Sequence, residues 1–235
     1  MNNKLIVKTM AFVAALFLLF SCFDDEVKKE YVADVYSTVR IIDGDTLFGL
    51  ESYFNANVPV KAVKMRTPGG GSDISMKQMT SNYFEYVLPE SAYTSTAPAT
   101  GEYIFDVTFD DNTQIVQIDN LTNKTIAPMQ IDSIVPHKQG DAVTVHWKRN
   151  PSADCYSIRV LDDNKIVLAT QLLDTASTKG TLVSYSNLWR NGAYPKEGDS
   201  LLMLIEGVIL EDNLTQYYKY QSISQSKKTL FVWPE

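Results

Sequence analysis

Cysteine and histidine are scarce in this chain. The 235 residues include two cysteines, Cys22 and Cys155, and two histidines, His137 and His146. Such numbers exclude a disulfide-rich scaffold, and the spacing of these residues matches no zinc-binding pattern. We therefore expect packed hydrophobic cores to hold the fold together, and we predict neither a metal nor any other cofactor.

Sequence motifs for catalysis are also absent. There is no Gly-x-Ser-x-Gly elbow, and Gly69-Gly70-Gly71 lacks the Lys-Ser/Thr that follows in a phosphate-binding loop. Cys155 lies beside Tyr156 in a strand-like run, which indicates a packed thiol instead of a nucleophile. The sequence thus predicts no catalytic residue and a protein that is not an enzyme.

The longest apolar run near the N-terminus is short. Met10–Phe20 follows Lys4 and Lys8, and its length suits a signal-peptide core better than a membrane-spanning helix. It ends in Leu19-Phe20-Ser21-Cys22, which resembles the lipobox of bacterial lipoproteins. The resemblance implies a signal peptide over residues 1–21 and lipid attached to Cys22, and so a membrane as partner and an outer-membrane location.

The residues after Cys22 are acidic, with Asp24-Asp25-Glu26 at their centre. This cluster resembles the export signal of Bacteroidetes-type surface lipoproteins, which implies display on the outside of the cell. The alternative is a solvated tether over residues 22–30. Without residues 1–21 the formal net charge is about −9, and a surface so acidic would be repelled by phosphates, which excludes nucleic acid as a partner.

The body of the chain shows a strand period instead of a helical one. Apolar and polar residues alternate in Tyr103–Phe109 and Val143–Trp147, while Leu201–Leu210 is almost continuously apolar, as in a central strand. We expect Tyr217–Tyr220 to be the partner of that central strand. The pattern predicts an all-β fold.

Turn residues support antiparallel pairing of these strands. Asp43-Gly44 is a short hairpin signal, and three similar tripeptides separate other strand candidates. Aspartate and asparagine tolerate positive φ, so they close hairpins without glycine. The three tripeptides are Asp110-Asp111-Asn112, Asp162-Asp163-Asn164 and Glu211-Asp212-Asn213.

A polar stretch before Pro128 divides the body in two. Each half has the length and the strand count of a sandwich, so we predict two tandem antiparallel β-sandwich domains over residues 31–126 and 128–235. In the second half, Asp141–Trp147 and Asp154–Val160 resemble early strands of a fibronectin type III domain. That resemblance implies that Trp147 and Tyr156 pack in the core. The first half resembles an immunoglobulin-like domain in its strand count and in the run Gly101–Val107.

One irregular segment, Leu182–Tyr194, departs from the fibronectin-like pattern. It carries Trp189 and Tyr194, whose rings could stack on a sugar, and Arg190 and Asn191, which could hydrogen-bond its hydroxyl groups. In the alternative interpretation, Trp189 closes the open end of the sandwich. The apolar C-terminal run Thr229–Trp233 either adds an edge strand to its own sheet or offers that edge to a partner.

These features together predict a lipid-anchored, surface-exposed, non-catalytic binding or adhesion protein, with glycan capture among its possible roles. One alternative is a structural spacer or subunit of a cell-envelope assembly, with an envelope protein as partner. The last alternative is an enzyme of a type that the motifs do not reveal.

Overall fold

Strands form nearly all of the computed structural model, which describes residues 28–234 except 72, 138–139, 164–166 and 212–218. The described residues contain sixteen strands and two short 3-10 helices, so the predicted all-β class is confirmed. Strands of the first half are β1 (Tyr31–Ile42), β2 (Asp45–Ala56), β3 (Val60–Arg66), β4 (Asp73–Ser75), β5 (Lys77–Thr80), β6 (Tyr83–Val87), β7 (Gly101–Phe109) and β8 (Gln114–Leu121). Strands of the second half are β9 (Ile131–Pro136), β10 (Ala142–Trp147), β11 (Cys155–Leu161), β12 (Val167–Asp174), β13 (Lys179–Val183), β14 (Ser200–Leu210), β15 (Tyr220–Gln225) and β16 (Thr229–Val232). The 3-10 helices are η1 (Glu90–Ala92) and η2 (Arg190–Gly192).

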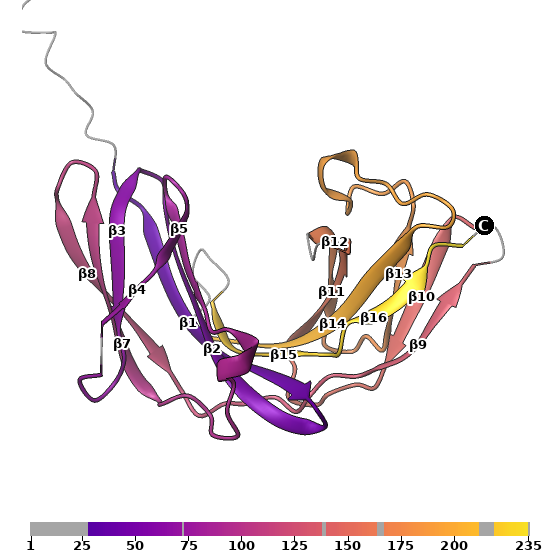
Figure 1. Ribbon diagram of the computed structural model, residues 1–235, viewed down its shortest axis with the longest axis horizontal. Coiled ribbons are helices and arrows are strands. Elements are labelled where there is room, and N and C mark those ends of the chain that lie inside the picture. Colours follow the sequence, from indigo (N-terminus) through magenta and orange to yellow (C-terminus); the bar gives the residue numbers. More distant parts are fainter. Residues whose placement is uncertain (1–27, 72, 138–139, 164–166, 212–218, 235) are drawn as a thin grey trace, which may run out of the picture. The chain divides into compact units, whose positions relative to one another are not determined.

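Two layers of strands enclose the core of the first half. The sheet β4-β3-β7-β8 packs against strands β1, β2 and β6, and both layers are visible at the left of Figure 1. Alternate residues of each strand point inward because strand side chains alternate between the two faces. The inward set includes Val35, Phe54, Val63, Phe84, Phe105 and Val107.

A second pair of layers encloses a separate core. The sheet β13-β10-β9 packs against strands β11, β14 and β16. Trp147 and Tyr156 pack there with ring centroids 5.4 Å apart, as the fibronectin-like pattern predicts. Ile126, which the sequence analysis assigns to the first sandwich, belongs to this second cluster, because the connection between the halves crosses β14 at Gly207.

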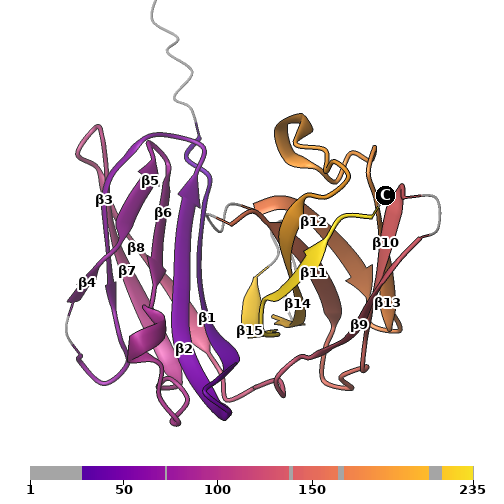
Figure 2. The ribbon, with the colours of Figure 1, turned by 45° about the vertical axis from the view of Figure 1, so that its right-hand side comes forward.

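The two sandwiches share one sheet, which the sequence did not predict. Its strand order is β12-β11-β14-β15-β1-β2-β6-β5, with β16 beside β14. Strand β15 lies between β14 and β1 (Figures 1 and 2), antiparallel to β14 and parallel to β1. Residues Tyr31–Glu235 accordingly form one compact unit. We call this continuous layer the shared sheet.

Two of the four turn predictions are confirmed. Asp43 and Gly44 have φ angles of 53° and 94° between the paired strands β1 and β2, as a two-residue hairpin turn requires. Asn112 takes a positive φ of 63° between β7 and β8. The other two tripeptides include residues 164 and 212–213, which lie outside the described residues, although the strands that flank them pair antiparallel, β11 with β12 and β14 with β15.

Strands β15 and β16, near the C-terminus, both pair with β14. Strand β15, Tyr220–Gln225, pairs with β14, so Tyr220 of the predicted run belongs to this partner, while residues 217–218 of that run lie outside the described residues. The C-terminal run forms β16, which pairs with β14 of its own sheet. The first of the two expected roles for this run is therefore the one observed.

Predictions for Cys22 and for the rest of residues 1–27 lie outside the described residues. Among the residues that are described, no helix has the length and the apolar content needed to cross a membrane.

Candidate functional site

The irregular segment between β13 and β14 places its aromatic residues in two different environments. Trp189 is 5% exposed, belongs to the second core and lies edge-on to Trp233 at 5.5 Å. Its indole Nε1–H donates a 2.8 Å hydrogen bond to the Val183 carbonyl oxygen. Trp189 therefore offers no exposed plane to a sugar, and its predicted stacking role was wrong, because the core of the sandwich takes up the ring.

Tyr194 is exposed, and its partner is Tyr185 instead of Trp189. The two side chains are 46% and 85% exposed, respectively, and their ring centroids lie 5.6 Å apart with 49° between the planes. Sequence reasoning missed Tyr185, although it lies in the same irregular segment. We call these two residues the tyrosine pair.

The 3-10 helix η2 precedes Tyr194, and the backbone between them forms a tight turn. Its Gly192 takes a φ of 69°, and the amide of Tyr194 donates a 2.8 Å hydrogen bond to the Gly192 carbonyl oxygen. Arg190 of η2 is exposed, and the role predicted for the Asn191 side chain lies outside what the structure describes. The segment thus presents two aromatic faces, two phenol groups and a guanidinium group to solvent. Aromatic faces of this kind stack on apolar ring surfaces, while the polar groups can bond to hydroxyls.

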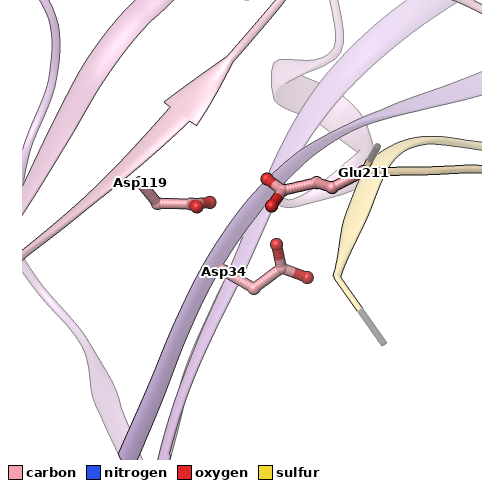
Figure 3. Close-up of side chains that lie close together, drawn as sticks. All are labelled: Asp34, Asp119 and Glu211. Atoms are coloured by element: carbon pink, nitrogen blue, oxygen red, sulfur yellow. The ribbon is translucent and has the colours of Figure 1, made fainter. Parts of the chain in front are cut away.

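A second group of side chains gathers where the two sandwiches meet. Asp34 of β1, Asp119 of β8 and Glu211 at the end of β14 each place a carboxylate oxygen within 4.8 Å of the others (Figure 3). The ammonium group of Lys219 lies against Asp119 and is 3.7 Å from Glu211. We call these four residues the junction cluster. No sequence signal predicted it, because its members lie far apart along the chain.

Backbone amides complete the contacts of the cluster. Asp34 accepts a 3.1 Å hydrogen bond from the Tyr220 amide, and Asp119 accepts one of 2.8 Å from the Val35 amide. Asp34 therefore binds the first residue of β15, and Asp119 binds β1 just before its pairing with β15 begins at Ser37. Asp34 and Asp119 are both buried, whereas Glu211 is half-buried.

Gln221 extends this polar contact between the halves. Its side-chain oxygen accepts hydrogen bonds from the Thr122 amide and hydroxyl at 2.8 and 2.6 Å. Its amide nitrogen donates to the Asn120 carbonyl oxygen at 3.0 Å and to Glu211 at 3.1 Å. Strand β15 is thereby joined to the end of β8, although the two belong to different sandwiches.

Burial shifts the pKa values in the cluster. It raises the pKa of Asp34 from 3.8 to about 8, and the negative charge of Asp119 acts in the same direction. Burial followed by the charge of Asp119 also raises the pKa of Glu211. For Lys219 burial acts to lower the pKa, but the hydrogen bond and charge of Asp119 outweigh it, so that the pKa is raised. The ammonium group remains charged and balances part of the negative charge.

Three close carboxylates suit a hard cation such as Ca²⁺, which takes six or more oxygen ligands. Here Lys219 already contacts two of the three carboxylates and supplies a positive charge. A raised carboxyl pKa is also typical of catalytic acids. However, Asp34 has no exposed surface from which it could contact a substrate. The arrangement therefore suits a structural joint better than a metal or catalytic site.

Comparison with known proteins yields no family. No protein-family model and no curated protein matches the chain. Solved structures give weak matches at 10–12% identity. One is a biofilm-associated protein, BSP domain, with a TM-score of 0.24 over 86% of this chain and 30% of that one.

Two further matches are chicken proteins. The FN1–FN3 domains of chicken CNTN1 match with a TM-score of 0.30 over 87% of this chain and 65% of that one. A segment of two fibronectin type III domains from chicken tenascin matches with a TM-score of 0.26 over 79% and 92%. The chain thus spans less than two thirds of the biofilm protein and of the CNTN1 segment. Similarities this low establish neither a family nor a function.

Proposed function

We propose that this chain is a lipid-anchored, surface-exposed and non-catalytic binding protein that contacts its ligand through the tyrosine pair. The observation that carries the proposal is the exposure of Tyr185, which is 85% exposed beside Tyr194. Exposed tyrosines are enriched where proteins bind partners, because the ring supplies a large contact area at little entropic cost.

A glycan is the ligand class that this surface fits best. The faces of the tyrosine pair can stack on the apolar side of a sugar ring. Arg190 and the two phenol groups can donate hydrogen bonds to ring hydroxyls. The acidic body as a whole opposes polyanionic ligands, so a neutral glycan is favoured over a strongly acidic one.

Membrane attachment in this proposal rests on the sequence. The run Leu19-Phe20-Ser21-Cys22 places Cys22 as the lipid acceptor, and the acidic residues that follow support display outside the outer membrane. Cells grown with labelled palmitate should incorporate the label into the native chain and not into a Cys22→Ala variant. Equal labelling of the two chains would contradict the anchor.

Neutral polysaccharides immobilised on an array test the binding proposal. The purified chain should bind at least one of them, and Tyr185→Ala and Tyr194→Ala should each weaken binding about fivefold, since the loss of one stacking contact costs on the order of 1 kcal/mol. Leu172→Ala, which changes an exposed residue of β12 in the same sandwich, is the control and should bind normally. Binding that survives both tyrosine substitutions would reject the tyrosine pair as the site.

A second candidate function is that of a subunit in a cell-envelope assembly. The edge strand β16 exposes Leu230 and Val232, which are 66% and 58% exposed, and an exposed apolar edge strand is a surface on which another chain can pair. Purification of the tagged chain from its own membrane separates the candidates. A stoichiometric protein partner, lost with Leu230→Lys, favours the assembly, and an isolated chain favours the ligand-binding role.

A further inference from the structure

The pairing between the two sandwiches is short. In the described residues, β1 and β15 share three residue pairs, Ser37 with Ser222, Thr38 with Ile223 and Val39 with Ser224. The polar contacts of the junction cluster and of Gln221 lie next to these pairs. We call the β1–β15 pairing, together with these polar contacts, the joint. A change in the charge of the cluster therefore acts directly on the joint.

We propose that the junction cluster is a pH-dependent latch: protonated Asp34 keeps β15 paired with β1, and ionisation of Asp34 loosens this pairing and frees the two sandwiches from each other. The proposal concerns the joint and does not depend on the ligand. It rests on three carboxylates that lie within 4.8 Å of one another, two of them buried, and on the ammonium group of Lys219, which contacts Asp119 and Glu211.

The balance of charge explains the direction of the change. While Asp34 carries a proton, the ammonium group of Lys219 faces at most the two negative charges of Asp119 and Glu211. After Asp34 ionises, the same ammonium group faces three carboxylates whose oxygens lie within 4.8 Å of one another. Repulsion between buried like charges is strong because little water screens it.

The other groups that face Asp34 cannot supply a compensating charge. From β2, the phenol group of Tyr53 hydrogen-bonds to the carboxyl group, and from β1 the phenol of Tyr36 lies within electrostatic reach. Burial raises the pKa of both phenols, so both are neutral in the range where Asp34 titrates. From β15, Tyr220 contributes its backbone amide and a phenol group whose pKa is raised by burial and by the charge of Asp34, so this phenol is neutral as well. Relief of the repulsion therefore requires either a proton or separation of the strands.

The sign of the pH dependence follows from the pKa of Asp34, which is about 8 in the closed state against an ordinary value of 3.8. The closed state binds a proton that the open state releases, so the contribution of Asp34 to closure is complete below about pH 4 and is lost as the pH rises to about 8. Between pH 5 and 7 the equilibrium constant for opening should rise about tenfold per pH unit, because one proton is linked to opening. It should become flat above about pH 8.

Hydrogen exchange of the full chain, measured residue by residue, tests the latch. The amides of Tyr220 and Ile223 report the joint, and the amide of Val145 in β10 reports the core of the second sandwich. Protection factors, which are corrected for the pH dependence of intrinsic exchange, should fall about a hundredfold from pH 5 to pH 7 for the two joint amides. The protection factor of Val145 should change less than threefold.

Two variants complete the test. Asp34→Asn keeps an acceptor for the Tyr220 amide but cannot ionise, so the joint amides should keep the same protection factor from pH 5 to pH 9. Asp45→Asn, at an exposed position at the start of β2, should behave as the native chain does. If Asp34→Asn fails to fold, the carboxyl carbon resonance of Asp34 in the native chain serves instead and should titrate together with the loss of protection. Flat protection in the native chain, or an unchanged pH profile in Asp34→Asn, would overturn the proposal.

Discussion

Glu206 is a carboxylate buried in the middle of β14, on the shared sheet. Arg159 of β11 binds it through a 2.9 Å contact between Nε and Oε2, and Gln225 of β15 donates a 2.8 Å hydrogen bond to Oε1. Burial raises the pKa of Glu206, although the charge of Arg159 acts to lower it. A buried carboxylate with one cationic neighbour makes the fold sensitive to the loss of that neighbour.

Arg159→Met should therefore destabilise the chain by about 2 kcal/mol, because Glu206 would be left without its counter-ion. The guanidinium group is partly exposed, which limits the effect. Urea unfolding of the native chain and of the variant measures this loss in the free energy of unfolding. The double variant Arg159→Met/Glu206→Gln removes the charge as well and should recover at least half of the loss. A double variant as unstable as the sum of its single substitutions would show that the two residues act independently.

At the residue scale, the sequence predicted two exposed aromatic rings in Leu182–Tyr194, and one of the two, Trp189, is buried. An irregular stretch with two or more aromatic residues predicts a surface loop, and Tyr194 is indeed exposed. The sequence did not show which aromatic side chain the core would take up. That choice depends on Trp233, which lies far along the chain and meets Trp189 edge-on. Tyr185, which the sequence reasoning passed over, is the ring that is exposed to solvent beside Tyr194.

Strand β14 is the element on which the second sandwich depends most. It pairs with β11 along one edge and with β15 and β16 along the other. Gly207 interrupts its apolar run where the connection from the first half passes over it. A Cβ atom at Gly207 would lie 2.8 Å from Ile126 Cδ1 and 2.9 Å from Met129 Sδ. The missing side chain thus makes room for the connection.

Gly207→Ala should cost about 1–2 kcal/mol, since an overpacked core must shift side chains or backbone. Ile126→Val removes the Cδ1 atom that the new methyl group would meet. The double variant should therefore be more stable than the sum of the two single effects predicts, and thermal unfolding of the four chains measures this coupling. Strict additivity would mean that the connection does not pack on Gly207 as described.

The strands themselves were the most predictable elements. Hairpin strands can be recognised in a sequence by period-two alternation and by turn residues such as Asp43-Gly44 and Asn112. The positive φ angles of these turn residues depend on the local sequence alone. Of the tyrosine-rich run that was predicted to pair with β14, Tyr220 is the first residue of β15. Its amide donates a hydrogen bond to Asp34, a contact from the other sandwich that the sequence did not indicate.

For the whole molecule, the sequence predicted two sandwiches but not the sheet that they share. Parallel pairing of β1 with β15 joins residues that lie near opposite ends of residues 31–235. No short turn connects two such strands, so no turn motif in the sequence indicates the pairing. The sequence did not predict the junction cluster either, since Asp34 and Asp119 lie in β1 and β8 of the first sandwich and Glu211 follows β14 of the second. Acidic residues distributed along a chain carry no information about which of them will be buried together.

The buried carboxyl groups should make the stability of the entire chain depend on pH. Burial raises the pKa of Asp34 to about 8 and also raises the pKa values of Glu51, Glu206 and Glu211. A carboxyl group with a raised pKa in the folded state contributes stability that is complete below its unfolded pKa and is lost as the pH rises through its folded pKa. We therefore expect the free energy of unfolding to fall by about 3 kcal/mol between pH 5 and pH 8.

Calorimetry at a series of pH values measures this effect, and the unfolding midpoint should drop by roughly 6–12 °C over that range for a chain of this size. Asp34→Asn should remove most of the drop, because Asp34 has the largest separation between its folded and unfolded pKa values that the structure quantifies for a carboxyl group. A midpoint that rises from pH 5 to pH 8 would show that ionised carboxylates stabilise this fold. The joint between the two sandwiches would then need an explanation other than a carboxyl group held in its neutral form.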